Sequence, residues 1–251
     1  MSSPRRSADA FSFQLMIGLC LLWGLQQVAI KLAAPDIATI VQASARSGIA
    51  ALLVGLLMCW RGGWEGIRQG TLPAGLLAGA LFAAEFLLIA LSLQYTAASH
   101  VAVFLYTAPI FSAVGLHLLL PGEQLRLLQW LGIAVCFGGI AVGFGAGMSL
   151  AEMDSRMLLG DALAVLAGMA WGATTVVVRT SRLSEAPPSL TLFYQLAVAF
   201  LLLLVIAFAF GQVRQVRLTP MAIGSVLFQG VVVSFASYFA WFWLLRRYLA
   251  S

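Results

Sequence analysis

Charged side chains are scarce in this sequence. Only 9% of its 251 residues are charged, whereas 62% are hydrophobic and the mean hydropathy is +0.99. A soluble domain carries about 25% charged residues, so the composition excludes an ordinary soluble protein. The apolar runs are long and lack the alternating polar residues of a membrane β-barrel. We therefore predict an all-α polytopic membrane protein.

Cysteine and histidine are also rare. Cys20, Cys59 and Cys136 fall in separate apolar runs, which predicts neither a disulfide nor a metal framework. His100 and His117 lie about 25 Å apart along one predicted helix, too far to share a metal ion. No nucleophile elbow, phosphate loop or metal motif occurs. We expect no enzyme activity, cofactor or metal, and the net charge of +5 needs no nucleic acid to explain it, since cations gather in cytoplasmic loops of membrane proteins.

What the sequence has in abundance is apolar runs long enough to cross a bilayer. A membrane helix needs about 20 apolar residues. The run that follows Arg5 and Arg6 lacks a small-residue cleavage site, so we interpret it as a retained first span and not a signal peptide. On this rule the sequence predicts eight spans, at about 13–33, 38–60, 72–93, 99–120, 126–146, 158–179, 189–210 and 220–244.

The distribution of cations predicts the orientation. With a cytoplasmic N-terminus, nine Arg fall on the cytoplasmic side against four Lys or Arg on the other. The positive-inside rule therefore favours a cytoplasmic N-terminus. An even number of spans returns the C-terminus to the same side, and we expect a multi-pass protein of the cell inner (plasma) membrane.

A short pattern occurs twice. Segment 23–31 reads WGLQQVAIK and segment 171–179 reads WGATTVVVR, an offset of 171−23=148 residues. Tyr95 and Tyr248, near the ends of spans three and eight, are offset by 248−95=153. Spans one to three thus correspond to spans six to eight. Because five spans precede the second copy, it starts on the opposite side, which predicts an inverted-topology repeat.

The repeat divides the chain into two domains. The first, 1–147, has five spans, and the second, 148–251, has three. Under a five-plus-five plan the second repeat is incomplete, and we expect a longer protein with two further helices. Gly139, Gly143 and Gly147 form a small-residue face on span five, and Gly75 and Gly79 form another on span three. We interpret both as packing faces within a monomer.

Several motifs together resemble a known family. They are the Trp23-Gly24…Lys31 opening, Arg46 inside span two, and a segment from Ala98-Ser99 through 106–111 (YTAPIF) to Gly122-Glu123 and 129–132 (QWLG). The chain resembles the drug/metabolite transporter superfamily, specifically its EamA-type exporters. The resemblance covers nearly the whole chain. It implies two five-helix repeats and small-metabolite transport, often amino-acid export of the YddG-like kind.

Charged residues inside spans are the sharpest candidates for function, because such groups are costly in lipid. Glu85 lies in the middle of span three and could bind a substrate amine or take up a proton. It could equally pair with Arg46 to hold two helices together. Arg46 could hold a substrate carboxylate, snorkel to the interface or pair with Glu85, and we favour a structural or gating role. Lys31, near the end of span one, could snorkel or act with this pair.

Polar and aromatic side chains on the same helix faces predict a substrate cavity at the repeat interface. Span eight carries Gly230, Ser234, Ser237, Tyr238 and Trp241 on one stripe, with Gln229 beside it. Pro109 is expected to bend span four. The predicted cavity residues are Trp23, Gln26, Gln27, Gln42, Phe82, Glu85, Tyr106, Trp171, Thr175, Tyr194, Ser234 and Tyr238.

These residues favour a secondary transporter that exports a small metabolite, such as an amino acid or a related amphiphile, by alternating access. Its partners would be the small-molecule substrate and the lipid bilayer. Two alternatives stay open at this point. The chain could export lipophilic cations as a multidrug exporter, or it could be a non-transporting assembly partner or an inactive fragment.

Overall fold

The structure is a computed structural model that describes residues 9–61, 64, 67, 70–120, 124–145 and 154–247, and this part of the chain contains helices and no strand. Seven helical segments in it are long and apolar enough to cross a membrane. The eighth predicted span is α7 (Leu127–Gly145), in which the apolar helical stretch Leu127–Gly139 is shorter than the other seven. The predicted polytopic helical fold is confirmed. Tyr248, used above to align the repeat, lies outside the described residues.

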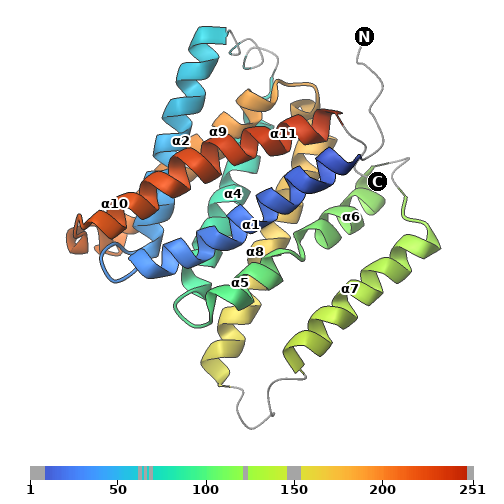
Figure 1. The fold of residues 1–251 in the computed structure, drawn as a ribbon. Helices are drawn as coiled ribbons and strands as arrows, with labels where there is room; N and C mark the ends of the chain where they lie inside the picture. Colours follow the sequence, from blue (N-terminus) through green and yellow to red (C-terminus); the bar gives the residue numbers. More distant parts are fainter. Residues whose placement is uncertain are drawn as a thin grey trace. The chain divides into compact units, whose positions relative to one another are not determined.

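The helices form two compact units, 1–70 with 186–251 and 71–185. Figure 1 labels most of their helices. The first unit contains α1 (Ala10–Ala33), α2 (Thr39–Arg61), α9 (Pro188–Ala209), η2 (Gln212–Gln215), α10 (Pro220–Leu227), η3 (Phe228–Ser237) and α11 (Tyr238–Arg247). The second contains α4 (Leu72–Ser92), α5 (Ala98–Leu105), α6 (Ala108–Leu119), α7, α8 (Ser155–Thr180) and η1 (Arg182–Ser184). The first unit therefore joins helices from the two ends of the sequence, whereas the second is one continuous segment.

Local sequence signals fix where the helices begin. Asp9 caps α1 by accepting the Ser12 backbone N–H at 2.8 Å, and the Ser12 hydroxyl accepts the Asp9 backbone N–H at 3.0 Å. This reciprocal capping box satisfies two backbone donors that the helix itself leaves free. Helices α4, α6, α9 and α10 each have proline in the first two positions, where the missing N–H costs nothing.

Helix α1 is polar on its inner face and apolar on its outer face. Its buried residues include Trp23, Gln26 and Gln27, while Leu21 and Leu25 are more than half exposed. An exposed leucine face is stable against hydrocarbon, and buried amides keep their polar groups away from it. The outer face is therefore suited to lipid.

Small residues on α2 allow it to lie close to α9 in the first unit. A Cβ at Gly48 would meet the Phe200 ring at 2.8 Å, and one at Gly55 would meet Phe193 at 3.4 Å. The Ser44 hydroxyl also donates to the Phe200 carbonyl oxygen at 3.1 Å. Close approach of this kind is how membrane helices associate without a hydrophobic driving force.

The last span of the first unit changes its winding. It runs as α-helix in α10, as π-helix in η3 and as α-helix again in α11, and it lies beside α1 (Figure 1). The wider π-helical turns rotate the residues that follow relative to a regular helix. In η3 they bury Gln229, Gly230, Ser234 and Ser237, so most of the predicted stripe of span eight faces α1 and α2.

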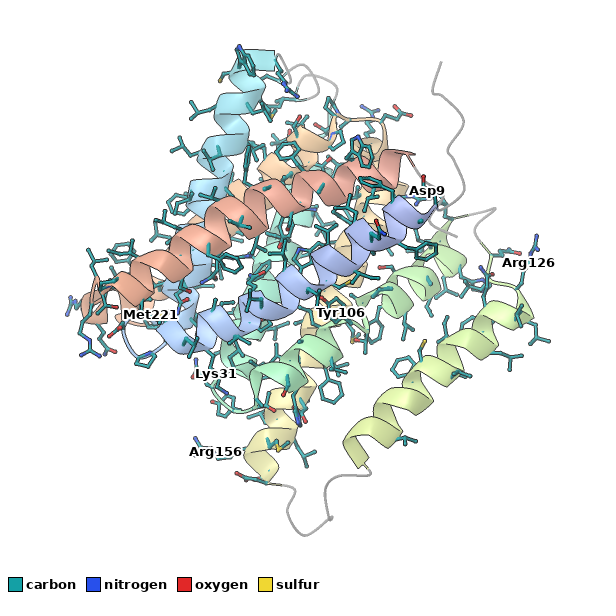
Figure 2. All side chains as sticks on the ribbon, in the orientation of Figure 1. Asp9, Lys31, Tyr106, Arg126, Arg156 and Met221 are labelled. Carbon is teal, nitrogen blue, oxygen red and sulfur yellow. The ribbon has the colours of Figure 1, made fainter. Side chains whose placement is uncertain are left out.

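Helix α8 is the helix against which α4, α5 and α6 pack in the second unit. Span four is divided into α5 and α6 because Pro109 has no N–H to donate to the Leu105 carbonyl. The expected bend at Pro109 is confirmed as a break at Tyr106 and Thr107, and Figure 2 labels Tyr106 there. The break lies against α8 at Gly168, where a Cβ would be 2.7 Å from Thr107 Oγ1.

Candidate functional site

The most deeply buried charge of the first unit is Arg46. Its side chain is 0% exposed, and its Nη1 donates to Ser234 Oγ of η3 at 3.0 Å. Hydrogen bonds from a charged donor contribute about 1.5–3 kcal/mol, roughly twice a neutral one. Arg46 therefore does not snorkel to the interface; it connects α2 to the π-helix inside the unit.

One turn before Arg46, Gln42 lies at the centre of a buried amide network. Its Nε2 donates to the Ile37 and Ile30 carbonyl oxygens at 2.8 and 3.1 Å, which closes the α1–α2 connection. Its Oε1 accepts Nε2 of Gln229 at 2.9 Å, and the same Nε2 is 2.9 Å from Ser225 Oγ. Both glutamines are 0% exposed. The network links α1, α2, α10 and η3 through side chains.

Trp23 of α1 has polar and aromatic neighbours on the last span. Its Nε1 donates to Ser237 Oγ at 2.8 Å. Its ring meets Tyr238 and Trp241 edge-on, at centroid distances of 6.3 and 5.9 Å. Such edge-to-face pairs contribute about 0.5–1.5 kcal/mol beyond area burial. Trp23, Ser234 and Tyr238, predicted as cavity residues, thus belong to one polar and aromatic region of the first unit.

Three buried glutamine side chains of this unit each have one amide atom that makes no hydrogen bond. Within the described part of the chain, Gln26 Nε2, Gln27 Oε1 and Gln229 Oε1 have no hydrogen-bond partner. The three side chains are 3%, 2% and 0% exposed. Leaving a polar group buried and unsatisfied costs about 1–3 kcal/mol, so these atoms are suited to a polar ligand or water.

Replacing Gln42 with leucine should destabilise the first unit. Gln42→Leu leaves the Ile30 and Ile37 carbonyls without their side-chain donor and removes an acceptor of Gln229. We expect a loss of about 2–3 kcal/mol, or a melting temperature lower by about 4–12 °C in detergent. Val41→Leu, beside it on α2 but only partly buried, is the control. An unchanged melting temperature for Gln42→Leu would mean that the network contributes nothing.

Most of the other predicted cavity residues belong to the second unit. Glu85 is 4% exposed and Phe82 is 6% exposed on α4, where the Phe82 ring packs edge-on against Phe86 at 4.8 Å. Trp171 and Thr175 share a face of α8 and are half-buried, with the Thr175 hydroxyl donating to the Trp171 carbonyl at 3.2 Å. A carboxylate at this depth in an apolar helix is a candidate for function, because such groups are costly to bury in lipid.

Two predicted residues of the first unit stand apart from the network just described. Tyr194 is buried on α9, at 5% exposure, and Lys31 is exposed near the end of α1, where Figure 2 labels it. That position fits a snorkelling side chain. The predicted cavity combines residues of both units and stays a prediction, as does the pairing of Arg46 with Glu85.

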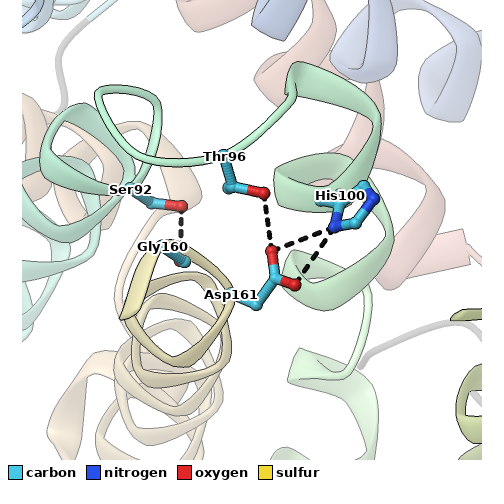
Figure 3. A network of polar contacts seen from close by, with 5 residues as sticks. All are labelled: Ser92, Thr96, His100, Gly160 and Asp161. Atoms are coloured by element: carbon cyan, nitrogen blue, oxygen red, sulfur yellow. Dashed lines mark hydrogen bonds and ion pairs between the residues drawn. The ribbon is translucent and has the colours of Figure 1, made fainter. Parts of the chain in front are cut away.

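The sequence analysis overlooked a polar cluster in the second unit, shown in Figure 3. Asp161 of α8 accepts a hydrogen bond from Thr96 Oγ1 at 2.7 Å, and both of its carboxylate oxygens are 3.1 Å from His100 Nδ1. The Ser92 hydroxyl donates to the Gly160 carbonyl at 2.7 Å beside it. The sequence contained a signal for this cluster, because Asp161 is an acidic residue within a predicted span. The same criterion selected Glu85.

The helices and their buried charges define a polytopic membrane protein with polar helix faces directed inward. The model of the EamA-like transporter family matches the chain at residues 11–144 and 158–251. The chain therefore belongs to the EamA-like transporter family, and it is a membrane transporter.

Two curated relatives agree with this assignment. An "Uncharacterized transporter YoaV" of Bacillus subtilis is 25% identical over 94% of this chain and 80% of its own length. An "Uncharacterized transporter" of Archaeoglobus fulgidus is 26% identical over 66% of this chain and 55% of its own length. No solved structure matches the chain.

Proposed function

We propose that this protein is a secondary transporter that exports amino acids or related amphiphilic metabolites by alternating access. The observation that carries the proposal is the set of buried amide atoms without a partner among the described residues, Gln26 Nε2, Gln27 Oε1 and Gln229 Oε1. A buried polar atom of this kind requires an explanation in a native protein. The explanation we propose is a polar substrate that forms hydrogen bonds with these atoms when it occupies the site during the transport cycle.

The chemistry of these atoms suits an amino acid. An amide N–H donates to a carboxylate, and an amide oxygen accepts from an ammonium group. The Trp23 ring, which packs edge-on against the Tyr238 and Trp241 rings of the last span, offers an apolar surface in the same unit. Glu85, buried on α4, would be the principal charged member of the pathway, as a partner of the amine or of a proton.

Alternating access would use the two sequence repeats, 1–147 and 148–251. The two separate matches of the family model, at 11–144 and 158–251, support this division. Inverted repeats give a transporter two related conformations, open to one side or the other, around one site near mid-membrane. We propose a cytoplasmic N-terminus and the inner (plasma) membrane on the cation distribution described above. The YddG-like subtype belongs to this proposal too.

Efflux from proteoliposomes tests the proposal together with the role of Glu85. Vesicles loaded with radiolabelled leucine, threonine or phenylalanine should release at least one of them faster with the protein than without it. Glu85→Gln should lower that rate by about tenfold or more, because the amide carries no charge. The melting temperature of this variant should stay close to wild type.

The control is Glu185→Gln, the same substitution at an exposed position after η1. It should transport like wild type. If Glu85→Gln melts much lower, Glu85 is a structural partner and not part of the pathway. If no amino acid is released but tetraphenylphosphonium is, the protein exports lipophilic cations and the amino-acid proposal is wrong.

A further inference from the structure

A groove of apolar side chains lies within the second unit, between α6, α7 and α8. It encloses about 610 Å³, which is within the range of about 300–1,000 Å³ found for small-molecule sites. The three helices line it with apolar and aromatic residues, among them Ile110, Trp130 and Ala173. Between membrane-spanning helices, a groove with this lining is suited to hydrocarbon.

Close packing of α6 against α8 forms the floor of the groove. A Cβ at Gly115 of α6 would be 2.6 Å from Val176 Cγ2 of α8, and both residues line the groove. Contact this close leaves no room for a ligand between these two helices. An occupant therefore lies between their shared surface and α7.

Aromatic contacts hold α7 alongside α6 at two levels. The His117 and Trp130 rings meet edge-on with centroids 5.5 Å apart, and His117 Nδ1 accepts the Leu125 backbone N–H at 2.8 Å. The Phe111 and Phe137 rings also meet edge-on, at 6.5 Å. Because long side chains make these contacts, the two helices stay far enough apart to leave space between them.

The length of the groove matches one leaflet of a bilayer. Helices α5 and α6 together form one candidate span, Ala98–Leu119, so α6 occupies about half of it. The groove follows α6 from Ile110 to Leu119, about 14 Å by helical rise. Half of the hydrocarbon core is about 15 Å thick, whereas a membrane helix of a second copy would need all of its roughly 30 Å. The groove therefore fits an acyl chain better than a helix.

Two arginines lie about one turn beyond the same end of the groove. Arg126 directly precedes α7, and its carbonyl oxygen accepts the Trp130 backbone N–H at 3.1 Å, so the two residues share a helix face. Arg179 of α8 is three residues after Val176 and shares a face with it in the same way. Trp130 and Val176 both line the groove and contact the second half of α6. Figure 2 labels Arg126 at the start of α7.

The charge at this end of the unit is positive. Arg182 in η1 adds a third arginine close after Arg179, and within the described residues Glu185 is the carboxylate that follows it. Asp154 and Asp161 belong to the other end of α8. Arginine binds phosphate with a planar set of donors, and basic sites between membrane helices bind the head groups of anionic lipids. The groove and the adjoining arginines are therefore complementary to the two parts of a phospholipid.

We propose that the groove binds an anionic phospholipid from the leaflet that contains α6. One acyl chain lies between α6, α7 and α8, and the phosphate lies at Arg126 and Arg179. The lipid fills the space that separates α7 from the rest of the unit and so stabilises its position. This inference goes beyond the proposed export function, because it holds whichever solute the protein transports.

A lipid titration of the protein in detergent tests the head-group contact. Phosphatidylglycerol at about ten times its dissociation constant should raise the melting temperature by about 3–6 °C. Phosphatidylcholine with the same acyl chains has no net charge and should raise it by about half as much or less. Glycerol phosphate has the phosphate but no acyl chain, and it should leave the melting temperature unchanged.

Arg126→Gln should remove at least about half of the difference between the two lipids, because it takes a cation from the phosphate. The matched control is Arg156→Gln, the same substitution at an exposed position near the start of α8. It should keep the wild-type difference. Equal responses of the two variants would mean that no head group binds at Arg126.

Ala173→Phe tests the position of the acyl chain. Its ring fills the groove, so the variant should lose the phosphatidylglycerol shift while melting within about 2 °C of wild type without lipid. Ala162→Phe, at an exposed position of the same helix, should keep the shift. Phosphatidylglycerol brominated on its acyl chains should also quench the fluorescence of wild type more than that of Trp130→Phe. If Ala173→Phe does not fold, Val114→Phe fills the groove from α6 instead.

Three results would overturn the proposal. They are equal shifts with the two lipids in wild type, an undiminished shift in Ala173→Phe, and equal quenching in wild type and Trp130→Phe. A dimer in light scattering that Ala173→Phe converts to a monomer, with no response to lipid, would assign the groove to a second copy of the chain. None of these measurements involves transport, so failure of the amino-acid proposal and failure of the lipid site are distinguishable.

Discussion

Arg46→Met should lower the stability of the protein by about 2–3 kcal/mol. The methionine keeps most of the length of the side chain but cannot donate to Ser234 Oγ, which Arg46 Nη1 reaches at 3.0 Å. Hydrogen bonds to charged groups contribute about 1.5–3 kcal/mol when buried, and Arg46 is 0% exposed. In a chain of this size the melting temperature should fall by about 4–12 °C.

The control for this prediction lies on the same helix. Arg61 is exposed at the end of α2, with its guanidinium 5.7 Å from the centre of the Trp60 ring. Exposed cation–π contacts contribute about 0.5–1 kcal/mol, so Arg61→Met should change the melting temperature much less. If the two substitutions lowered the melting temperature equally, the hydrogen bond of buried Arg46 to η3 would not be what stabilises the protein.

Gly172→Val should destabilise the second unit by about 3 kcal/mol or more. A Cβ at Gly172 would meet Phe111 Cβ at 2.7 Å, the Ser112 backbone nitrogen at 3.0 Å and the Ala108 carbonyl oxygen at 3.1 Å. These atoms belong to the backbone of α6 or lie next to it, so they cannot rotate away as the end of a long side chain would. Helix α6 must move off α8, and overpacking of this kind typically costs 1–3 kcal/mol and occasionally more.

Gly132→Val on α7 is the matched control, since a Cβ there would have nothing within 4 Å. It makes the same substitution in the same unit and should leave the melting temperature within about 2 °C of wild type. Gly172→Ala should fall between the two variants because it adds only the first of the clashing atoms. A wild-type melting temperature for Gly172→Val would mean that α6 and α8 are not in close contact in the membrane.

Most of the helical fold could be predicted from hydropathy alone. The span expected at 38–60 is α2 (Thr39–Arg61), and the span expected at 189–210 is α9 (Pro188–Ala209). The agreement is close because a backbone in hydrocarbon must satisfy its hydrogen bonds internally, which leaves few alternatives to a helix. Pro109 predicted the position of the break between α5 and α6, because proline has no backbone N–H to donate to the preceding turn.

The winding of the last span could not be predicted. Residues 220–244 read as one apolar helix, but their middle is the π-helix η3. A π-helix is selected by contacts distant in sequence, here the bonds of Ser234 to Arg46 and of Ser237 to Trp23. No pattern within the span itself encodes those partners. Sequence reasoning therefore found the polar stripe but not the geometry that buries it.

Small-residue spacing predicted two glycine faces with different outcomes. Gly75 and Gly79 of span three are buried on α4, whereas Gly147 of the face expected on span five lies outside the described residues. The face expected on span five includes Gly139, yet a Cβ at Gly139 would have nothing within 4 Å. Close contacts on α8 are instead made by Gly160, Gly168 and Gly172, spaced by eight and four residues. Spacing predicts which faces could approach another helix. Which of them does so depends on the neighbours that the chain topology supplies.

The discontinuous first unit also dictates an order of events during synthesis. Helices α1 and α2 leave the ribosome first, yet Arg46 and its partner Ser234 are 188 residues apart. At about 5–20 residues per second, that separation lasts roughly 10–40 s. During this interval the polar groups of Arg46, Gln42 and Trp23 need other hydrogen-bond partners, which water, the insertion machinery or one another can provide. The second unit is a single stretch of chain and can form during this interval. Newly made protein should therefore pass through a stage in which the second unit is folded and the first unit still lacks α10, η3 and α11.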